Sequence, residues 1–528
     1  MELILTLFIP LAGAIILLFV NREKHNFIKY FTLSVSLLTF IVSLFLLSKF
    51  DFNNTNFQFL TEAIWIERLN AGFRVGVDGI SILLVMLTTF ITPITILSSF
   101  SAIEKRNKEY YFLLLLLQFA ITGVFVALDL FLFYIFWELV LIPMYFIIGL
   151  WGGKNRIYSA VKFFIYTVVG SLFMLVAIIW LGLYVGGNIL HLPGGFTSNF
   201  MQIREVLSQN PISFDIEKWL FLAFALSFCI KVPLFPLHTW LPDAHTEAPT
   251  PGSVILAGIL LKLGTYGLIR FNIELFPHSA YFYAPYISIL AVIGIIYGAL
   301  VSAVQTDVKR LVAFSSVSHL GFVVLGIFSI TVEGMQGAII QMVNHGLSTG
   351  MLFLAVGILY ERRHTREIAE YGGIARVMPA FSVFFGIAML ASVGLPGLNG
   401  FVGEFLCLLG AFKSPVLNSY LFTIFGATGV IFAAVYLLTM FQKVVFGPIT
   451  NPHNHSLKDL NKREWAYLVP IVIFIVWIGV YPKFFLNYSE KTVKSVVSKV
   501  HTQSLGNTST LNNLNLLKNI ESNLGAKK

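Results

Sequence analysis

The chain has 528 residues, of which 57% are hydrophobic and only 12% are charged, and its formal net charge is +9. Ordinary globular proteins carry about 25% charged residues, so this composition excludes a soluble enzyme. The excess positive charge lies mostly in alternate loops, which is typical of membrane topology and not of nucleic-acid binding.

Apolar runs long enough to cross a bilayer core of about 30 Å recur along nearly the whole chain. Only helices and closed barrels satisfy their own backbone in lipid, and these runs do not alternate as barrel strands do. We therefore predict an all-α integral membrane protein with about fourteen spans. They lie near residues 3–20, 28–48, 77–100, 111–128, 130–150, 158–186, 218–238, 251–271, 281–302, 309–330, 335–360, 379–411, 419–446 and 465–482.

The distribution of basic residues predicts the orientation. Arg22 and Lys24 directly follow the first run, and the loops after the other odd-numbered spans hold most of the remaining bases. This asymmetry predicts an even number of spans, with both termini on the outer side of the membrane. Beyond about residue 485 the sequence becomes polar, and we predict a tail that is partly disordered or forms one amphipathic turn.

Two of the predicted spans are interrupted. The seventh has Pro233 and Pro236 just after Lys231, and the twelfth contains the stretch SVGLPGLNG at 392–400. Broken spans at matching places in two halves are typical of inverted-repeat transporters. We therefore predict a three-helix segment at 1–104, inverted five-helix repeats at 105–272 and 273–450, a loop and last helix at 451–485, and a polar tail at 486–528.

Four ionisable residues stand inside otherwise apolar spans: Glu138, Lys231, Lys262 and Glu404. Such a group at the bilayer centre costs about 2.5–3.5 kcal/mol, so by default it marks a proton or ion route. The alternatives are a structural ion pair for Glu138, snorkelling of the two lysines to an interface, and a helix-capping role for Glu404.

Histidines offer further titratable groups. His319 and His345 lie within the tenth and eleventh spans, where each could relay protons near neutral pH or simply join two helices by a hydrogen bond. His238 and His245 flank the loop after the broken seventh span. Three prolines favour a rigid loop there over a metal site, with His238 as a candidate point of proton uptake. The two cysteines have no metal-ligand spacing, and no nucleotide-binding motif is present.

Three segments carry a resemblance to a known family. The run HTWLPDAHTEAPTPGSVILAGILLKLGTYGLIRF at 238–271 closely resembles the antiporter-like proton-channel subunits of respiratory complex I, NADH:quinone oxidoreductase. FWELVLIPMYFIIGLWGG at 136–153 and SSVSHLGFVVLGIF at 315–328 are similar to the same subunits. Sodium/proton antiporters and membrane-bound hydrogenases share HTWLPDAH. Glutamate at position 404, where sister subunits usually have lysine, favours the branch called subunit M or chain 4.

The resemblance implies roles for the buried residues. Glu138 would tune the proton affinity of Lys231, Lys262 would pass protons to the second half, and Glu404 would release them. FMN, iron–sulfur clusters, NADH and quinone would be bound by other subunits, with none on this chain. The partners would be membrane lipid and the other membrane-arm subunits, especially the sister antiporter-like ones. A subunit of a sodium/proton antiporter or of a hydrogenase complex, and a scaffold with inert charges, remain as alternatives.

Overall fold

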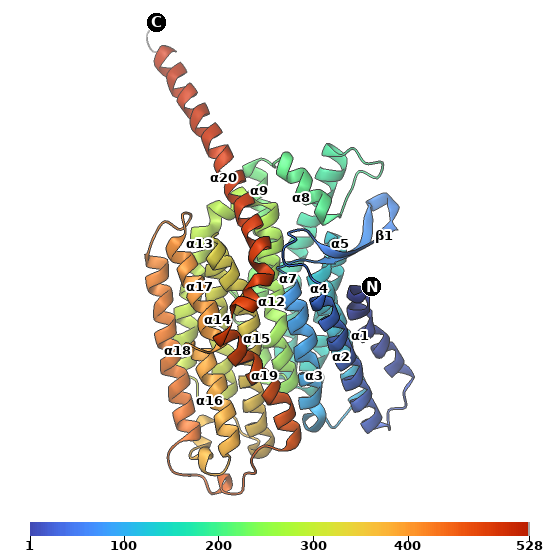
Figure 1. Cartoon of the computed structure of the whole chain (residues 1–528), viewed down its shortest axis with the longest axis vertical. Coiled ribbons are helices and arrows are strands. Elements are labelled where there is room, and N and C mark those ends of the chain that lie inside the picture. Colours follow the sequence, from blue (N-terminus) through green and yellow to red (C-terminus); the bar gives the residue numbers. More distant parts are fainter. Residues whose placement is uncertain (526–528) are drawn as a thin grey trace.

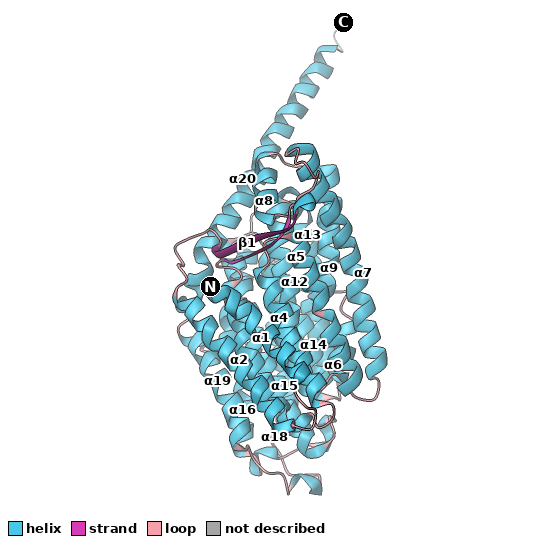
Figure 2. Ribbon diagram, turned by 90° about the vertical axis from the view of Figure 1, so that its right-hand side faces the viewer, coloured by secondary structure: helices cyan, strands magenta, loops and turns pink. Residues whose placement is uncertain are grey.

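The computed structural model describes residues 1–525, with side chains up to residue 504. Most helices run side by side along one direction, as Figures 1 and 2 show. Among the described residues, twelve helices are long and apolar enough to cross a membrane, which confirms the all-α membrane class. They are α1 (Glu2–Phe19), α2 (His25–Ser48), α3 (Ile82–Ala102), α4 (Asn107–Val126), α5 with α6 (Leu130–Leu139, Leu141–Trp151), α7 with η2 (Arg156–Leu183, Tyr184–Ile189), α11 to η4 (Thr250–Ile273), α13 (Pro277–Ala303), α14 (Val308–Phe328), α15 (Val332–Arg363), α18 (Leu421–Val445) and α19 (Lys462–Val480).

The count of about fourteen spans is not confirmed, because the two interrupted segments fall outside these twelve. The first consists of α9 (Phe214–Lys231) and α10 (Trp240–Glu247), separated by a turn that contains Pro233 and Pro236. The second consists of α16 (Pro379–Val393) and α17 (Asn399–Lys413). Gly394 follows α16 at φ +84°, a left-handed conformation that glycine adopts without strain. Both predicted breaks are therefore confirmed, whereas the boundaries of the two repeats stay a prediction.

The centre of the bundle is formed by three membrane segments that are buried on every side. These are α14, α15 and the segment from α11 to η4, which contains α11 (Thr250–Ile255), η3 (Leu256–Leu260), α12 (Leu261–Gly267) and η4 (Leu268–Ile273). By contrast, α7 and α18 expose Val176 and Ile431, among other large apolar side chains. Apolar side chains facing outward suit lipid, so the polar groups inside the three central segments are shielded from it.

One end of the bundle carries a β-hairpin that the sequence analysis missed. Strand β1 (Gln58–Ile66) pairs antiparallel with β2 (Ala71–Val77), and α8 (Phe200–Gln209) lies at the same end (Figure 2). We call this the hairpin end, and the opposite one, which holds residues 446–461, the loop end. Short 3-10 turns complete the element order: η1 (Glu67–Leu69), η5 (Ile368–Glu370), η6 (Ile374–Arg376) and η7 (Pro452–Asn454).

The C-terminal region differs from its prediction. Residues expected to be partly disordered, or to form one amphipathic turn, form the helix α20 (Lys483–Gly525), which projects beyond the hairpin end (Figure 1). Val493, Val496, Val497 and Val500 follow the spacing of one helix face and are all buried. The Ser- and Asn-rich composition concealed this stripe, because only its periodicity and not its overall polarity predicts a helix.

Asp129 forms an ion pair with Arg74 that connects the hairpin to the bundle. Its side chain is 1% exposed, and its Oδ2 lies 2.7 Å from Arg74 Nη1. Its Oδ1 also accepts hydrogen bonds from the backbone N–H groups of Phe131 and Leu132, which caps the start of α5.

Replacing Asp129 with alanine is expected to destabilise the protein by about 3–5 kcal/mol, because Arg74 would keep a buried, unpaired charge. Thermal unfolding of the purified protein, together with native-gel assembly, measures the loss. Asp215→Ala is the control, since Asp215 pairs with Lys218 while 88% exposed and should tolerate the change. Equal stability of the Asp129 and Asp215 variants would contradict the role of this ion pair.

Candidate functional site

Lys231 lies where the broken helix α9 ends. Its side chain is 1% exposed, and its Nζ has no hydrogen-bond partner among the described residues. The ammonium instead lies 5.5 Å from the ring centroid of Trp137 and 5.3 Å from that of Phe163. Aromatic faces attract a cation, but they do not accept its proton. The burial rules out snorkelling to the surface.

Glu138, at the end of α5, lies within electrostatic range of Lys231 but does not form an ion pair with it. The side chain is half-buried, and Oε1 has no hydrogen-bond partner among the described residues. The structure therefore brings the predicted pair into one neighbourhood and leaves a gap between the two charges.

Lys262 is fully buried on α12, between the π-helical stretches η3 and η4. Such wider turns disturb the regular backbone bonding and often occur at functional sites. The Nζ donates to the backbone carbonyl of Ala257 and lies 2.8 Å from His345 Nδ1. Because an ammonium can only donate, His345 Nδ1 accepts and its proton is left on Nε2.

Helix α12 approaches α9 closely at Gly264. A Cβ at this position would lie 2.7 Å from the carbonyl oxygen of Phe228 and 2.9 Å from the backbone nitrogen of Val232. Glycine therefore lets the segment that carries Lys262 lie directly beside the end of α9 that carries Lys231. No hydrogen bond joins the two lysines in the described part of the chain.

His319, on α14, connects the buried row to Glu404. Its Nδ1 lies 2.7 Å from Glu404 Oε1, and its ring centroid lies 5.9 Å from that of His345. A carboxylate only accepts, so Nδ1 donates and Nε2 is free to accept from the Tyr436 hydroxyl at 3.4 Å. Lys262, His345, His319 and Glu404 thus form one continuous buried row.

Three amides around Glu404 were not singled out from the sequence. Gln341 Nε2 donates to Glu404 Oε1 at 3.0 Å. Asn344 and Asn399 each donate from Nδ2 to the other's backbone carbonyl, at 2.7 and 3.2 Å, which ties the start of α17 to α15. Gly403 allows this approach, since a Cβ there would lie 2.3 Å from Gln341 Oε1. The sequence feature that could have indicated them is the pair of amides Gln341 and Asn344, three residues apart in the middle of α15.

The two histidines near the α9–α10 break are buried in aromatic surroundings. His238 is 3% exposed, and its ring centroid lies 5.0 Å from that of Tyr297. His245 is stacked on Phe353 with ring centroids 4.8 Å apart. Among the residues whose side chains are described, no group of three or more His, Cys, Asp or Glu could hold a metal ion. The uptake role of His238 stays a prediction.

Lys309 also differs from what its position in the sequence suggested. It lies near the start of α14, where a charge usually marks membrane topology, but its side chain is only 6% exposed. The Nζ donates to the carbonyl of Ala248, and the residue lines a cavity of about 140 Å³ together with Glu247 and Arg366. A polar cavity therefore reaches toward α10 at the loop end.

Comparison with known proteins gives concordant matches over nearly the whole chain. Residues 127–458 match the family model described as NADH:quinone oxidoreductase/Mrp antiporter, TM, and residues 4–124 match NADH-ubiquinone oxidoreductase chain 4, amino terminus. NADH-quinone oxidoreductase subunit M of Rickettsia prowazekii is 44% identical over 94% of this chain and 98% of its own length. NADH-ubiquinone oxidoreductase chain 4 of Marchantia polymorpha is 43% identical over 93% of this chain and 95% of its own length.

Comparison with solved structures leads to the same family. A chain of respiratory complex I from Thermus thermophilus with bound NADH has a TM-score of 0.83 and 32% identity, covering 95% of this chain and 100% of that one. A chain of the Mrp complex from Dietzia has a TM-score of 0.80 with 95% and 99% coverage. Its 18% identity supports a common fold only.

Proposed function

The chain belongs to the antiporter-like membrane subunits of NADH:quinone oxidoreductase, in the branch of subunit M, and we propose that its buried row of side chains carries the protons. The observation that supports this most strongly is the buried row from Lys262 to Glu404, which is hydrogen-bonded at both ends and has the rings of His345 and His319 in its middle, with centroids 5.9 Å apart. It runs through the two central helices α14 and α15, which lipid does not reach.

The hydrogen-bond polarity suits transfer from Lys262 toward Glu404. The Lys262 ammonium gives a proton to His345 Nδ1, and His345 releases the proton on its Nε2 toward His319. His319 takes that proton on Nε2, which then no longer accepts from the Tyr436 hydroxyl, and releases the one on Nδ1 to Glu404 Oε1. Each histidine gains and loses one proton and ends in its other tautomer, so the row returns to its starting state when Glu404 has released its proton, both rings have regained their first tautomer and Lys262 is protonated again.

Uptake begins at the loop end in this proposal. The cavity beside Lys309 and the buried His238 lie between that end and Lys231, and Glu138 sets whether Lys231 holds or releases its proton. Release follows Glu404, on the side of the hairpin end, which we place outside a bacterial cytoplasmic membrane from the loop charges.

The energy must come from outside this chain. Moving one charge against 100 mV costs about 2.3 kcal/mol. FMN, iron–sulfur clusters, NADH and quinone belong to other subunits in this proposal, and a conformational or electrostatic change transmitted through the sister antiporter-like subunits gates the row.

The test is ion movement by the intact complex in sealed vesicles. With NADH and quinone in a sodium-free medium, we expect proton movement that stops when quinone reduction is inhibited. A subunit of a sodium/proton antiporter would instead exchange sodium for protons without NADH, and that result would overturn the proposal.

A further inference from the structure

A second line of polar side chains leads from Lys262 toward the hairpin end and takes no part in the row described above. Lys262, Tyr266, Arg270 and Glu274 occur at every fourth position from α12 through η4 to the residue that follows it, so they follow one side of this segment. The line would offer protons on Lys262 a short way out of the first half. If this route were open, protons could leave from Lys262 without passing through the second half of the protein.

Arg270 interrupts this line with a fixed charge. Its side chain is 1% exposed, with Nη2 at 2.6 Å from Asp78 Oδ1 and Nη1 at 2.7 Å from Glu274 Oε1. Asp78 is itself 2% exposed and accepts backbone hydrogen bonds at the start of α3 from Ile80 and Ser81. The guanidinium is therefore held rigidly by acids from two separate segments.

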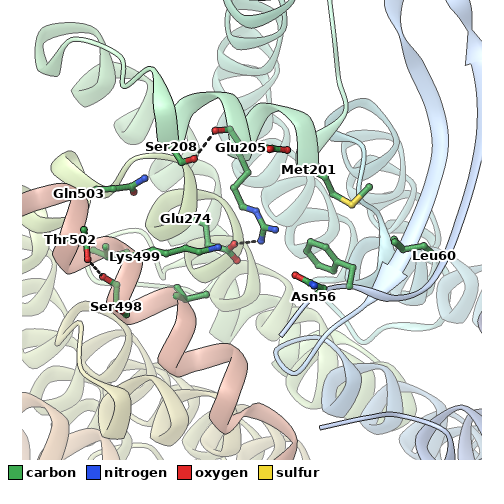
Figure 3. Close-up of a pocket in the computed structure, with 14 residues that line it drawn as sticks. Asn56, Leu60, Met201, Glu205, Ser208, Glu274, Ser498, Lys499, Thr502 and Gln503 are labelled. Carbon is green, nitrogen blue, oxygen red and sulfur yellow. Dashed lines mark hydrogen bonds and ion pairs between the residues drawn. The ribbon is translucent and has the colours of Figure 1, made fainter. Parts of the chain in front are cut away.

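A cavity of about 780 Å³ lies beyond Arg270 at the hairpin end. Figure 3 shows Glu274 among the residues that line it, with Lys499 and Gln503 contributed by α20 and Glu205 by α8. Phe57 also lines the cavity, and Arg270 lies beneath it, with the guanidinium carbon 4.9 Å from the ring centroid. The ion-paired Arg270 thus stands between the cavity and Lys262, packed against the aromatic rings of Phe57, Phe200 and Tyr266.

The hydrogen bonds at Arg270 point the wrong way for a proton to pass. Arg270 Nε donates to the Tyr266 hydroxyl oxygen at 3.3 Å, and that hydroxyl donates to the carbonyl of Phe125 at 3.1 Å. A guanidinium has five donors, no acceptor, and does not lose its proton in proteins. A proton on the inner side therefore meets a donor, and the hydroxyl before it is already committed to a backbone carbonyl.

We propose that Arg270, held by Asp78 and Glu274, is a proton barrier that closes the hairpin end of the first half. The inference rests on the proposed function: a proton that reaches Lys262 then leaves only through His345 and the second half. Fixed arginines exclude protons from water pores by the same combination of charge and donor-only hydrogen bonding. Without the barrier, protons already pumped would return through Lys262 under the membrane potential.

The test is passive proton leak in sealed vesicles that hold the whole complex, without NADH. Arg270→Met combined with Asp78→Asn removes the ion pair without leaving an unpaired buried charge, and Glu274 keeps its partner Arg204. After an acid pulse on the hairpin side, we expect the rate of internal acidification to rise about tenfold or more over the wild type. The leak requires no turnover, so it is measurable even if the complex proves not to pump.

Arg204→Met is the matched control, because Arg204 also pairs with Glu274 but is 28% exposed at the cavity rim. It should leave the leak unchanged. If the double variant does not assemble, Arg270→Lys keeps the charge and both acids while introducing an amine that can release its proton, and it should also leak. An unchanged leak in the assembled Arg270 variants, or an equal leak in Arg204→Met, would overturn the proposal.

Discussion

Replacing Lys262 with methionine is expected to reduce proton pumping at least about tenfold while the complex remains assembled. Methionine nearly matches the length of the lysine stem and is apolar, so it fills the fully buried site without leaving a charge there. The change removes the donor to His345 Nδ1 and so separates the first half from the row that ends at Glu404. NADH-driven quinone reduction and vesicle acidification, measured on the same preparation, check the result.

Lys262→Arg separates charge from proton transfer. Arginine keeps the positive charge beside His345 but does not release a proton, so we expect it to fail as completely as methionine. Lys413→Met is the control, because it makes the same substitution at a lysine that is 51% exposed and pairs with Glu333. Full pumping by Lys262→Arg would show that Lys262 contributes only its charge.

The helix breaks could be predicted from the sequence because their causes are local. Pro233 and Pro236 remove backbone donors two and five residues after Lys231, and Gly394 adopts a conformation that other residues avoid. The long apolar runs likewise predicted most spans, since membrane thickness sets their length.

The contacts within the row could not be predicted in the same way. Lys262 and His345 are 83 residues apart, and His319 and Glu404 are 85 apart. A buried charge in an apolar run shows its depth in the membrane but not the direction in which its helix face points. The sequence therefore indicated that the four residues of the row lie inside the membrane, whereas the order of their contacts came from helix packing.

Arg270 shows a different failure of the sequence analysis. A charged residue near the end of an apolar run looks like a marker of the membrane boundary, and its partner Asp78 is 192 residues away. The β-hairpin was missed for a related reason, because its two strands lie between two strong apolar runs and are defined by their pairing with each other. Features that depend on distant partners leave little local signal.

Removing either the Lys231 amine or the Glu138 charge is expected to reduce pumping about tenfold with assembly intact. Lys231 Nζ and Glu138 Oε1 both lack hydrogen-bond partners in the described part of the chain, so each retains the capacity to bind the other or water. The aromatic rings of Trp137 and Phe163 hold the ammonium without accepting its proton. A gap of this kind lets a small movement of Glu138 change how tightly Lys231 holds its proton.

A double-mutant cycle tests whether the two residues act as one switch. If Glu138 works only through Lys231, the combination of Glu138→Gln with Lys231→Ala should pump no less than Lys231→Ala alone, because residues in one unit are not additive. Glu23→Gln, an exposed change in the loop after α1, serves as the control and should leave pumping intact. A scaffold with inert charges predicts normal pumping in every assembled variant. Unchanged pumping in Lys231→Ala would therefore remove Lys231 from the proton route, whereas additive losses would mean that Glu138 acts on another group.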